Sequence, residues 1–137
     1  MAVAALITWL ITALGGFYML GVWIRRGGLG RSETRSTRLP APVAFGHLLL
    51  AAAGLIVWII YVAAGGSGLA WTAFVILLPV ALLGFVMLAR WIPAYRARAT
   101  TASAVAESAI PAPVVVLHGL LAVVTLILVL VTALGAA

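Results

Sequence analysis

The sequence predicts an all-α membrane protein in which four transmembrane helices form a single domain, residues 1–137. Of its 137 residues, 66% are hydrophobic and only 7% are charged, whereas soluble domains carry about 25% charged residues. Four apolar runs are each long enough to cross a bilayer, which takes about 20 helical residues. Two of these runs are similar to the other two, so the four helices are further predicted to be a tandem duplication of a two-helix hairpin.

The ends of the expected helices are marked by arginine, proline and glycine. The first helix stops at Arg25 and Arg26, and no basic segment precedes it as in a secretory signal peptide, so we expect it to be retained. The second begins at Pro40 and Pro42, where the missing N–H costs little. The third contains Pro79, which should kink it. The four helices are expected at approximately residues 3–24, 40–63, 69–92 and 111–134.

The positive charges predict the orientation in the membrane. All eight basic residues are arginines, and they fall in the first and third connections. By the positive-inside rule these connections are cytoplasmic and both termini lie outside. We attribute the net charge of +6 to this topology and to anionic lipids, and expect no nucleic-acid partner. Many alanines and no lysine suggest a GC-rich bacterial genome, hence a bacterial inner membrane.

Several classes of chemistry are excluded by composition. The chain has no cysteine, which excludes disulfides, thiolate metal sites and covalent c-type haem. The only acidic residues, Glu33 and Glu107, lie in the connections, so no span carries a carboxylate. No Ser/His/Asp set or phosphate-binding loop is present. We therefore expect an electron-transfer or accessory subunit more than a stand-alone enzyme, and assign no function to the linker 99–109.

The clearest internal repeat surrounds the two histidines. Residues 39–63 and 110–134, compared at an offset of 71, agree at 10 of 25 positions, including a Pro-Ala-Pro-Val start and the histidines His47 and His118. These are the only two histidines in the chain.

A second similarity covers the other two helices at an offset of 68. It relates GFYMLGVWI, from Gly16 to Ile24, to GFVMLARWI, from Gly84 to Ile92. The predicted repeat units are approximately 1–66 and 67–137. Each crosses the membrane twice, so the copies should be related by a pseudo-twofold axis along the membrane normal.

This symmetry places the histidines in one layer of the bundle. His47 and His118 each follow the second proline of their helix by five residues, about 8 Å from its cytoplasmic end. Counting eight residues, about 12 Å, back from the expected inner ends of the other helices at Ile24 and Ile92 reaches Gly16 and Gly84, near the same layer. Glycine in a membrane helix allows close approach of another helix or a flat ligand.

Three interpretations of the histidine pair remain open. The imidazoles could simply hydrogen-bond within the bundle. They could form a metal or proton site, although zinc needs three or four ligands and a proton relay usually has several titratable groups in series. The third interpretation is b-type haem held by both histidines, with Val43, Ala51, Val114 and Ala122 lining the slot and Phe17 and Phe85 near the ring. Its propionates would meet arginines at the near interface, namely Arg25, Arg26, Arg38, Arg90 and Arg96.

This layout resembles the four-helix membrane b-type cytochromes, including the cytochrome b561-like group. The resemblance rests on His47 and His118 with Gly16 and Gly84 opposite them, and covers the four-helix core. It implies haem b with the two histidines as axial ligands to the iron. Those relatives commonly carry two histidine pairs, whereas this chain has one, so electron flow across the membrane is not implied.

The resemblance predicts a haem b electron-transfer subunit near the cytoplasmic face. A quinone or a redox protein would be its electron-exchange partner, in contact with the surrounding lipid bilayer. The alternative is a non-redox accessory or assembly subunit of a membrane complex, or a small transporter. The sequence leaves open whether the chain forms a homo-oligomer.

Overall fold

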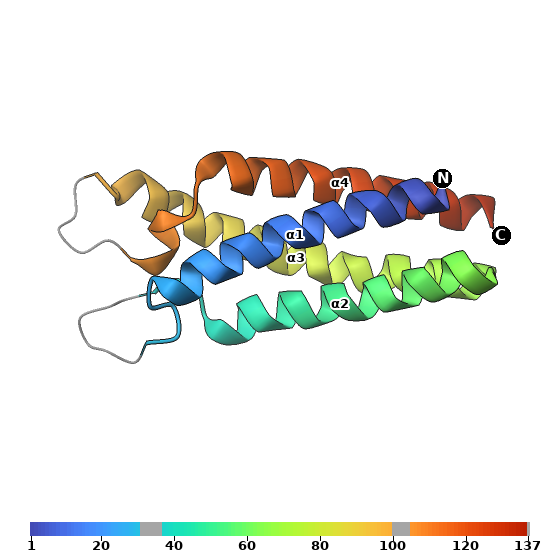
Figure 1. The fold of residues 1–137 in the computed structure, drawn as a ribbon, viewed down its shortest axis with the longest axis horizontal. Coiled ribbons are helices and arrows are strands. Elements are labelled where there is room, and N and C mark those ends of the chain that lie inside the picture. The colour runs from blue at the N-terminus through green and yellow to red at the C-terminus, as the bar shows by residue number, and fades with distance from the viewer. Residues whose placement is uncertain (31–36, 100–104, 137) are drawn as a thin grey trace.

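The computed structural model describes residues 1–30, 37–99 and 105–136, and consists of four long helices (Figure 1). Each is long and apolar enough to cross a membrane, which confirms the predicted all-α fold of a multi-pass membrane protein. Arg31, Glu33 and Arg35 lie outside the described residues. The helices are α1 Ala2–Arg25, α2 Ala41–Ala64, α3 Ser67–Ala97 and α4 Ala112–Gly135, with a short 3-10 helix, η1 Ala106–Ala109, before α4.

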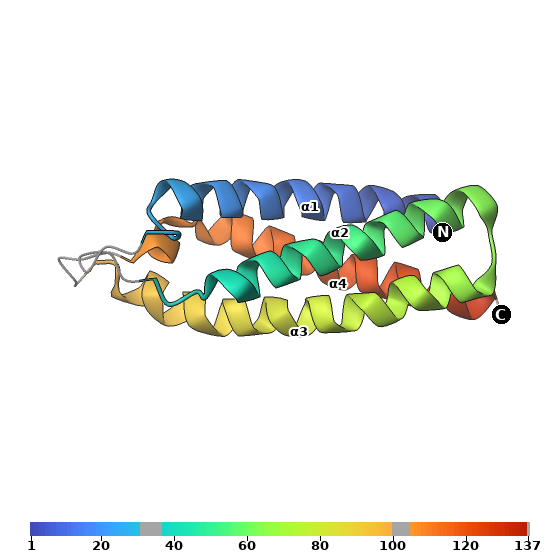
Figure 2. The ribbon, with the colours of Figure 1, turned by 90° about the horizontal axis from the view of Figure 1, so that it is seen from below.

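The helices run lengthwise side by side, and the two ends of the bundle differ. Both chain termini and the short turn between α2 and α3 lie at one end, and the two longer connections lie at the other (Figures 1 and 2). We call the second the arginine-rich end. It holds the six described arginines, Arg25, Arg26, Arg38, Arg90, Arg96 and Arg98.

Each helix has two neighbours and one diagonal partner. α2 packs most extensively against α3, and α1 against α4, while smaller contacts join α1 to α2 and α3 to α4. The backbones of α1 and α3, and those of α2 and α4, do not approach each other closely, so each of these pairs occupies opposite corners. The two helices that carry the histidines are therefore diagonal, and only side chains reaching the bundle axis can bring them together.

Buried residues on α1 and α3 account for this packing. They are three or four residues apart up to Thr12 on α1 and up to Val80 on α3, as expected for helices packed side by side. On both helices a stretch without buried residues follows, 13–21 on α1 and 81–90 on α3, before burial resumes. The buried residues are Ala5, Trp9, Thr12, Val22 and Trp23 on α1, and Ala70, Ala73, Leu77, Val80, Trp91 and Ala94 on α3.

Helix α3 is longer than predicted. It continues through both Pro79 and Pro93 and ends at Ala97, five residues beyond the expected end at Ile92. Proline removes one helical hydrogen bond, but Trp91 and Ala94 on either side of Pro93 are buried. Burial of these side chains keeps the last turns helical where proline alone suggested a boundary.

A buried carboxylate joins the two connections at the arginine-rich end. Glu107 on η1 is fully buried. One of its oxygens accepts a hydrogen bond from the backbone N–H of Arg38, and the other accepts one from the Thr37 hydroxyl at 2.9 Å. The Thr37 oxygen in turn accepts the indole N–H of Trp23 at 3.1 Å. The linker to which no function was assigned thus fixes the start of α2, which carries His47.

Replacing Glu107 should therefore loosen this end of the bundle. Glu107→Ala removes the acceptor of the Arg38 N–H and leaves the Thr37 hydroxyl with only the Leu39 carbonyl, at 3.3 Å. It should lower the free energy of unfolding by about 1–3 kcal/mol. Reversible unfolding in detergent micelles measures the loss. Ser108→Ala is the matched control, since that hydroxyl bonds only within its own turn, to the Val105 carbonyl. A loss of equal size in both variants would contradict a stabilising role of the Glu107 hydrogen bonds to Thr37 and Arg38.

Candidate functional site

The two histidines bind backbone carbonyls on neighbouring helices. His47 Nδ1, on α2, lies 2.9 Å from the carbonyl oxygen of Val80 on α3. His118 Nδ1, on α4, lies 2.9 Å from the carbonyl oxygen of Thr12 on α1. Each imidazole thus bridges the helix pair with the most extensive packing, and the two sets of contacts match in atoms and distance.

Each carbonyl that accepts a histidine hydrogen bond belongs to the residue four positions before one of the two glycines predicted to face the histidines. In a helix, the carbonyl of residue i accepts the N–H of residue i+4, so the Thr12 oxygen lies beside Gly16 and the Val80 oxygen beside Gly84. A Cβ at Gly16 would lie 3.3 Å from His118 Cε1, and a Cβ at Gly84 would lie 3.5 Å from the same atom of His47. The missing side chains leave the carbonyls open to the imidazoles.

The sequence thus predicted that the glycines lie opposite the histidines, but it gave the space beside each glycine to a ligand. Gly16 and Gly84 were expected to make room for the edges of a flat ligand, whereas the described structure fills the space beside each with an imidazole. The backbone acceptors were missed. A glycine four residues after a potential acceptor was the signal that could have indicated them.

These contacts determine the state of the rings. A carbonyl oxygen only accepts hydrogen bonds, so Nδ1 must carry the proton in both histidines. In the neutral ring the lone pair is then on Nε2. Metal-binding histidines typically have this arrangement, in which the non-ligating nitrogen donates to a carbonyl that fixes the orientation of the ring.

The imidazoles meet at the bundle axis although their helices are diagonal. Their ring centroids are 6.3 Å apart and their planes are inclined by 54°. The sequence-based prediction that His47 and His118 share one layer of the bundle agrees with this separation. Both rings are only partly buried.

The histidine layer separates two tightly packed clusters. Toward the termini, one cluster includes Trp9, Trp58 and Val129; toward the arginine-rich end, the other includes Trp23 and Trp91. Trp58 is fully buried and Trp23 is 2% exposed, whereas His47, His118, Gly16 and Gly84 are all intermediate. The core is therefore less closed at the histidines than on either side of them.

One buried donor lies between this layer and the arginine-rich end. Within the described chain, Trp91 Nε1 is a buried side-chain nitrogen with no hydrogen-bond partner. The residue is only 8% exposed. Trp91 follows Gly84 by seven residues, so it lies on the same helix face about 10 Å further along. In the sequence, Trp91 is part of the repeated segment from Gly84 to Ile92, and its seven-residue spacing from Gly84 was the available signal.

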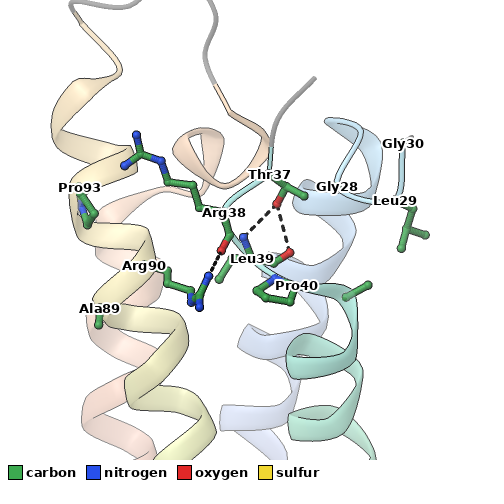
Figure 3. A pocket seen from close by; sticks show the side chains of 11 residues that line it. Gly28, Leu29, Gly30, Thr37, Arg38, Leu39, Pro40, Ala89, Arg90 and Pro93 are labelled. Atoms are coloured by element: carbon green, nitrogen blue, oxygen red, sulfur yellow. Dashed lines mark hydrogen bonds between the residues drawn. The ribbon is translucent and has the colours of Figure 1, made fainter. Parts of the chain in front are cut away.

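The arginines predicted to meet the haem propionates lie on the surface of the bundle, whereas the histidines lie inside it. Arg25, Arg26, Arg38, Arg90 and Arg96 all lie at the arginine-rich end with exposed side chains. Arg25 Nε donates to the Gly21 carbonyl of its own helix at 3.3 Å, and Arg90 donates to the Arg38 carbonyl at 2.9 Å (Figure 3). The aromatic residues next to the glycines, Phe17 and Phe85, are exposed on the outside of the bundle, at 55% and 63%, and not directed at the histidines.

Among residues 1–30, 37–99 and 105–136, no three histidine, cysteine or acidic side chains gather as a metal site. The donor set at the bundle axis is therefore two imidazoles, which is too few for a zinc site built from protein ligands alone. Comparison of the chain with protein-family models, with curated proteins and with solved structures finds no match. What the site does must be argued from its own geometry.

The close contact at Gly16 predicts how the site responds to added volume. Gly16→Leu should displace the His118 ring and break its bond to Thr12, lowering the free energy of unfolding by about 1–3 kcal/mol. Gly21→Leu, one turn further along α1, is the control, because nothing lies within 4 Å of a Cβ there. Unfolding in micelles and the nitrogen NMR shifts of His118 provide the measurements. Unchanged His118 shifts in Gly16→Leu would contradict the proposed contact.

Proposed function

We propose that this protein binds haem b in the membrane through His47 and His118 and serves as an electron-transfer subunit. The observation that carries the proposal is the pair of imidazoles on diagonal helices. Each is fixed by a hydrogen bond from Nδ1, which leaves the lone pair of Nε2 to bind a metal. Haem iron takes one axial ligand on each face of the ring, and nitrogen donors from opposite corners of a bundle meet that requirement.

The spacing of the imidazoles supports this use. A metal–imidazole bond is about 2 Å long, so two imidazoles on opposite sides of one metal ion have ring centres about 6 Å apart. The observed separation is 6.3 Å. The match is between the ring centres alone.

The surroundings of the histidines also fit a haem. The macrocycle is apolar, and the layer lies between hydrophobic clusters in a bundle with no carboxylate in its spans. The unpaired N–H of Trp91 is a donor for a propionate. The exposed arginines, Arg25, Arg26, Arg38, Arg90 and Arg96, make this end electropositive, which favours propionates directed toward it.

When bound, such a haem supplies a one-electron couple with both axial positions occupied by protein. The residues of this chain would hold it, set its orientation and keep water from its faces. Because there is one histidine layer, nearer the arginine-rich end, electrons would be exchanged at that end with a quinone or a redox protein. By the positive-inside rule we infer that this end is cytoplasmic, in a bacterial inner membrane.

We further infer that the site arose by duplication of a helical hairpin. Thr12 and Val80, whose carbonyls accept the histidine hydrogen bonds, are separated by 68 residues, as are Gly16 and Gly84, while the histidines are separated by 71. These are the two offsets of the sequence repeat. The matching contacts support a pseudo-twofold axis through the histidine layer.

The second candidate is a non-redox accessory subunit of a membrane complex. The observation that favours it is that each imidazole already has one hydrogen bond and fills the space beside a glycine. In this case the histidines would only join the helix pairs, and the protein would have no absorption in the visible range.

Absorption spectroscopy distinguishes the two. Protein purified from cells supplied with haem should be red, with a Soret band and the sharp bands of low-spin haem after reduction. His47→Ala and His118→Ala should each abolish the low-spin spectrum, because one axial ligand is lost. Gly119→Ala, next to His118 with nothing within 4 Å, is the control and should keep it. A colourless protein after haem supplementation would refute the proposal.

Trp91 tests how the haem is oriented. Trp91→Phe keeps most of the buried ring but removes the N–H. A hydrogen bond to a charged group contributes about 1.5–3 kcal/mol, so haem should be bound about 10- to 100-fold more weakly. Transfer of haem to an acceptor protein measures the change. Trp71→Phe, at the other end of α3, should release haem like the wild type; identical behaviour of both variants would contradict the role of Trp91.

A further inference from the structure

A separate groove opens at the arginine-rich end, outside the histidine layer. It has a volume of about 820 Å³ and lies between the end of α3 and the connection that leads into α2 (Figure 3). Arg38 and Arg90 provide its charge. Its walls are otherwise largely apolar or glycine, and include Leu29, Leu39, Pro40, Ala89 and Pro93.

The Arg90 guanidinium is held against the backbone of Arg38, and no described acidic side chain pairs with either arginine. Arg90 donates one N–H to the Arg38 carbonyl at 2.9 Å, which leaves its other N–H groups for a ligand. The nearby carboxylate of Glu107 is occupied by the Arg38 backbone N–H and by Thr37. Neither arginine side chain forms a salt bridge with a described residue. Within the part of the chain that the structure describes, the two positive charges of the groove are therefore not neutralised by a carboxylate.

Its position along the bundle corresponds to the level of lipid headgroups. Arg90 follows Gly84 by six residues, about 9 Å along α3 toward the arginine-rich end. Trp23 and Trp91 lie at the same end, and tryptophan is enriched at the membrane interface. A phosphate group is the anion that a bilayer supplies at this depth.

An apolar track leads from the groove toward the membrane interior. Leu82, Val86, Ala89 and Pro93 follow one another on α3 at spacings of four, three and four residues, so they share one face of the helix. All four are exposed, Leu82 at 66% and Val86 at 42%. A lipid whose phosphate met the arginines could lay an acyl chain along this face, which a free phosphate ion could not do.

We propose that the groove binds the phosphate of an anionic phospholipid between Arg38 and Arg90, with an acyl chain along the exposed face of α3. Binding depends on charge complementarity at the groove and on the apolar track. It does not require the histidines, so it is independent of the proposed haem.

The test measures thermal unfolding of detergent-solubilised protein in the presence of added phosphatidylglycerol, phosphatidylcholine or inorganic phosphate. Phosphatidylglycerol should raise the unfolding temperature of the wild type more than the other two. In Arg38→Gln and in Arg90→Gln, the lipid concentration needed for the same rise in unfolding temperature should be about 5-fold higher than in the wild type. Arg96→Gln, an exposed arginine on α3 outside the groove, is the matched control and should respond like the wild type.

Three outcomes would overturn the proposal. These are an equal loss in Arg96→Gln, a response to inorganic phosphate as large as to the lipid, and no loss in either groove variant. Arg90→Gln also removes a hydrogen bond to the Arg38 carbonyl, so it could weaken lipid binding by disturbing the fold. Arg38→Gln has no such effect, because the Arg38 side chain makes no hydrogen bond to the described residues. The double variant His47→Ala/His118→Ala should retain the lipid response. That result separates the groove from the proposed haem site.

Discussion

The arrangement of the site depends on two hydrogen bonds from imidazole N–H groups to backbone carbonyls. In a membrane interior a polar group without a partner is costly, so each ring is held where a carbonyl is accessible. Thr12 and Val80 supply these carbonyls because glycine stands four residues later. The glycines, the helix pairing and the orientation of the rings are thus consequences of one constraint.

That constraint also explains why the core is divided. Large buried aromatic residues close the bundle on both sides of the histidine layer, with Trp9 and Trp58 toward the termini and Trp23 toward the arginine-rich end. At the layer itself, glycine and histidine replace such residues, and they are only partly buried. The most completely buried side chains of the bundle thus lie on either side of the histidine layer.

The arginine-rich end combines structural and surface roles that the sequence did not separate. Glu107 is buried and fixes the connection to α2, while Arg38 on the same connection directs its side chain to the surface. One buried carboxylate thus holds the backbone of a segment whose arginine side chain is exposed. From the sequence, five of the arginines were assigned to one ligand, because distance along the chain does not distinguish an inward from an outward side chain.

Hydropathy, proline and the internal repeat are local signals, so the four spans, their class and the pairing of His47 with His118 could be predicted from the sequence. Helix geometry further predicted Gly16 and Gly84 opposite the histidines. The folded bundle was needed to show that the histidine helices are diagonal, that Thr12 and Val80 accept the ring protons, and that the buried Trp91 N–H has no partner among the described residues. These features depend on how helices rotate against one another, and no pattern within a single helix specifies that rotation.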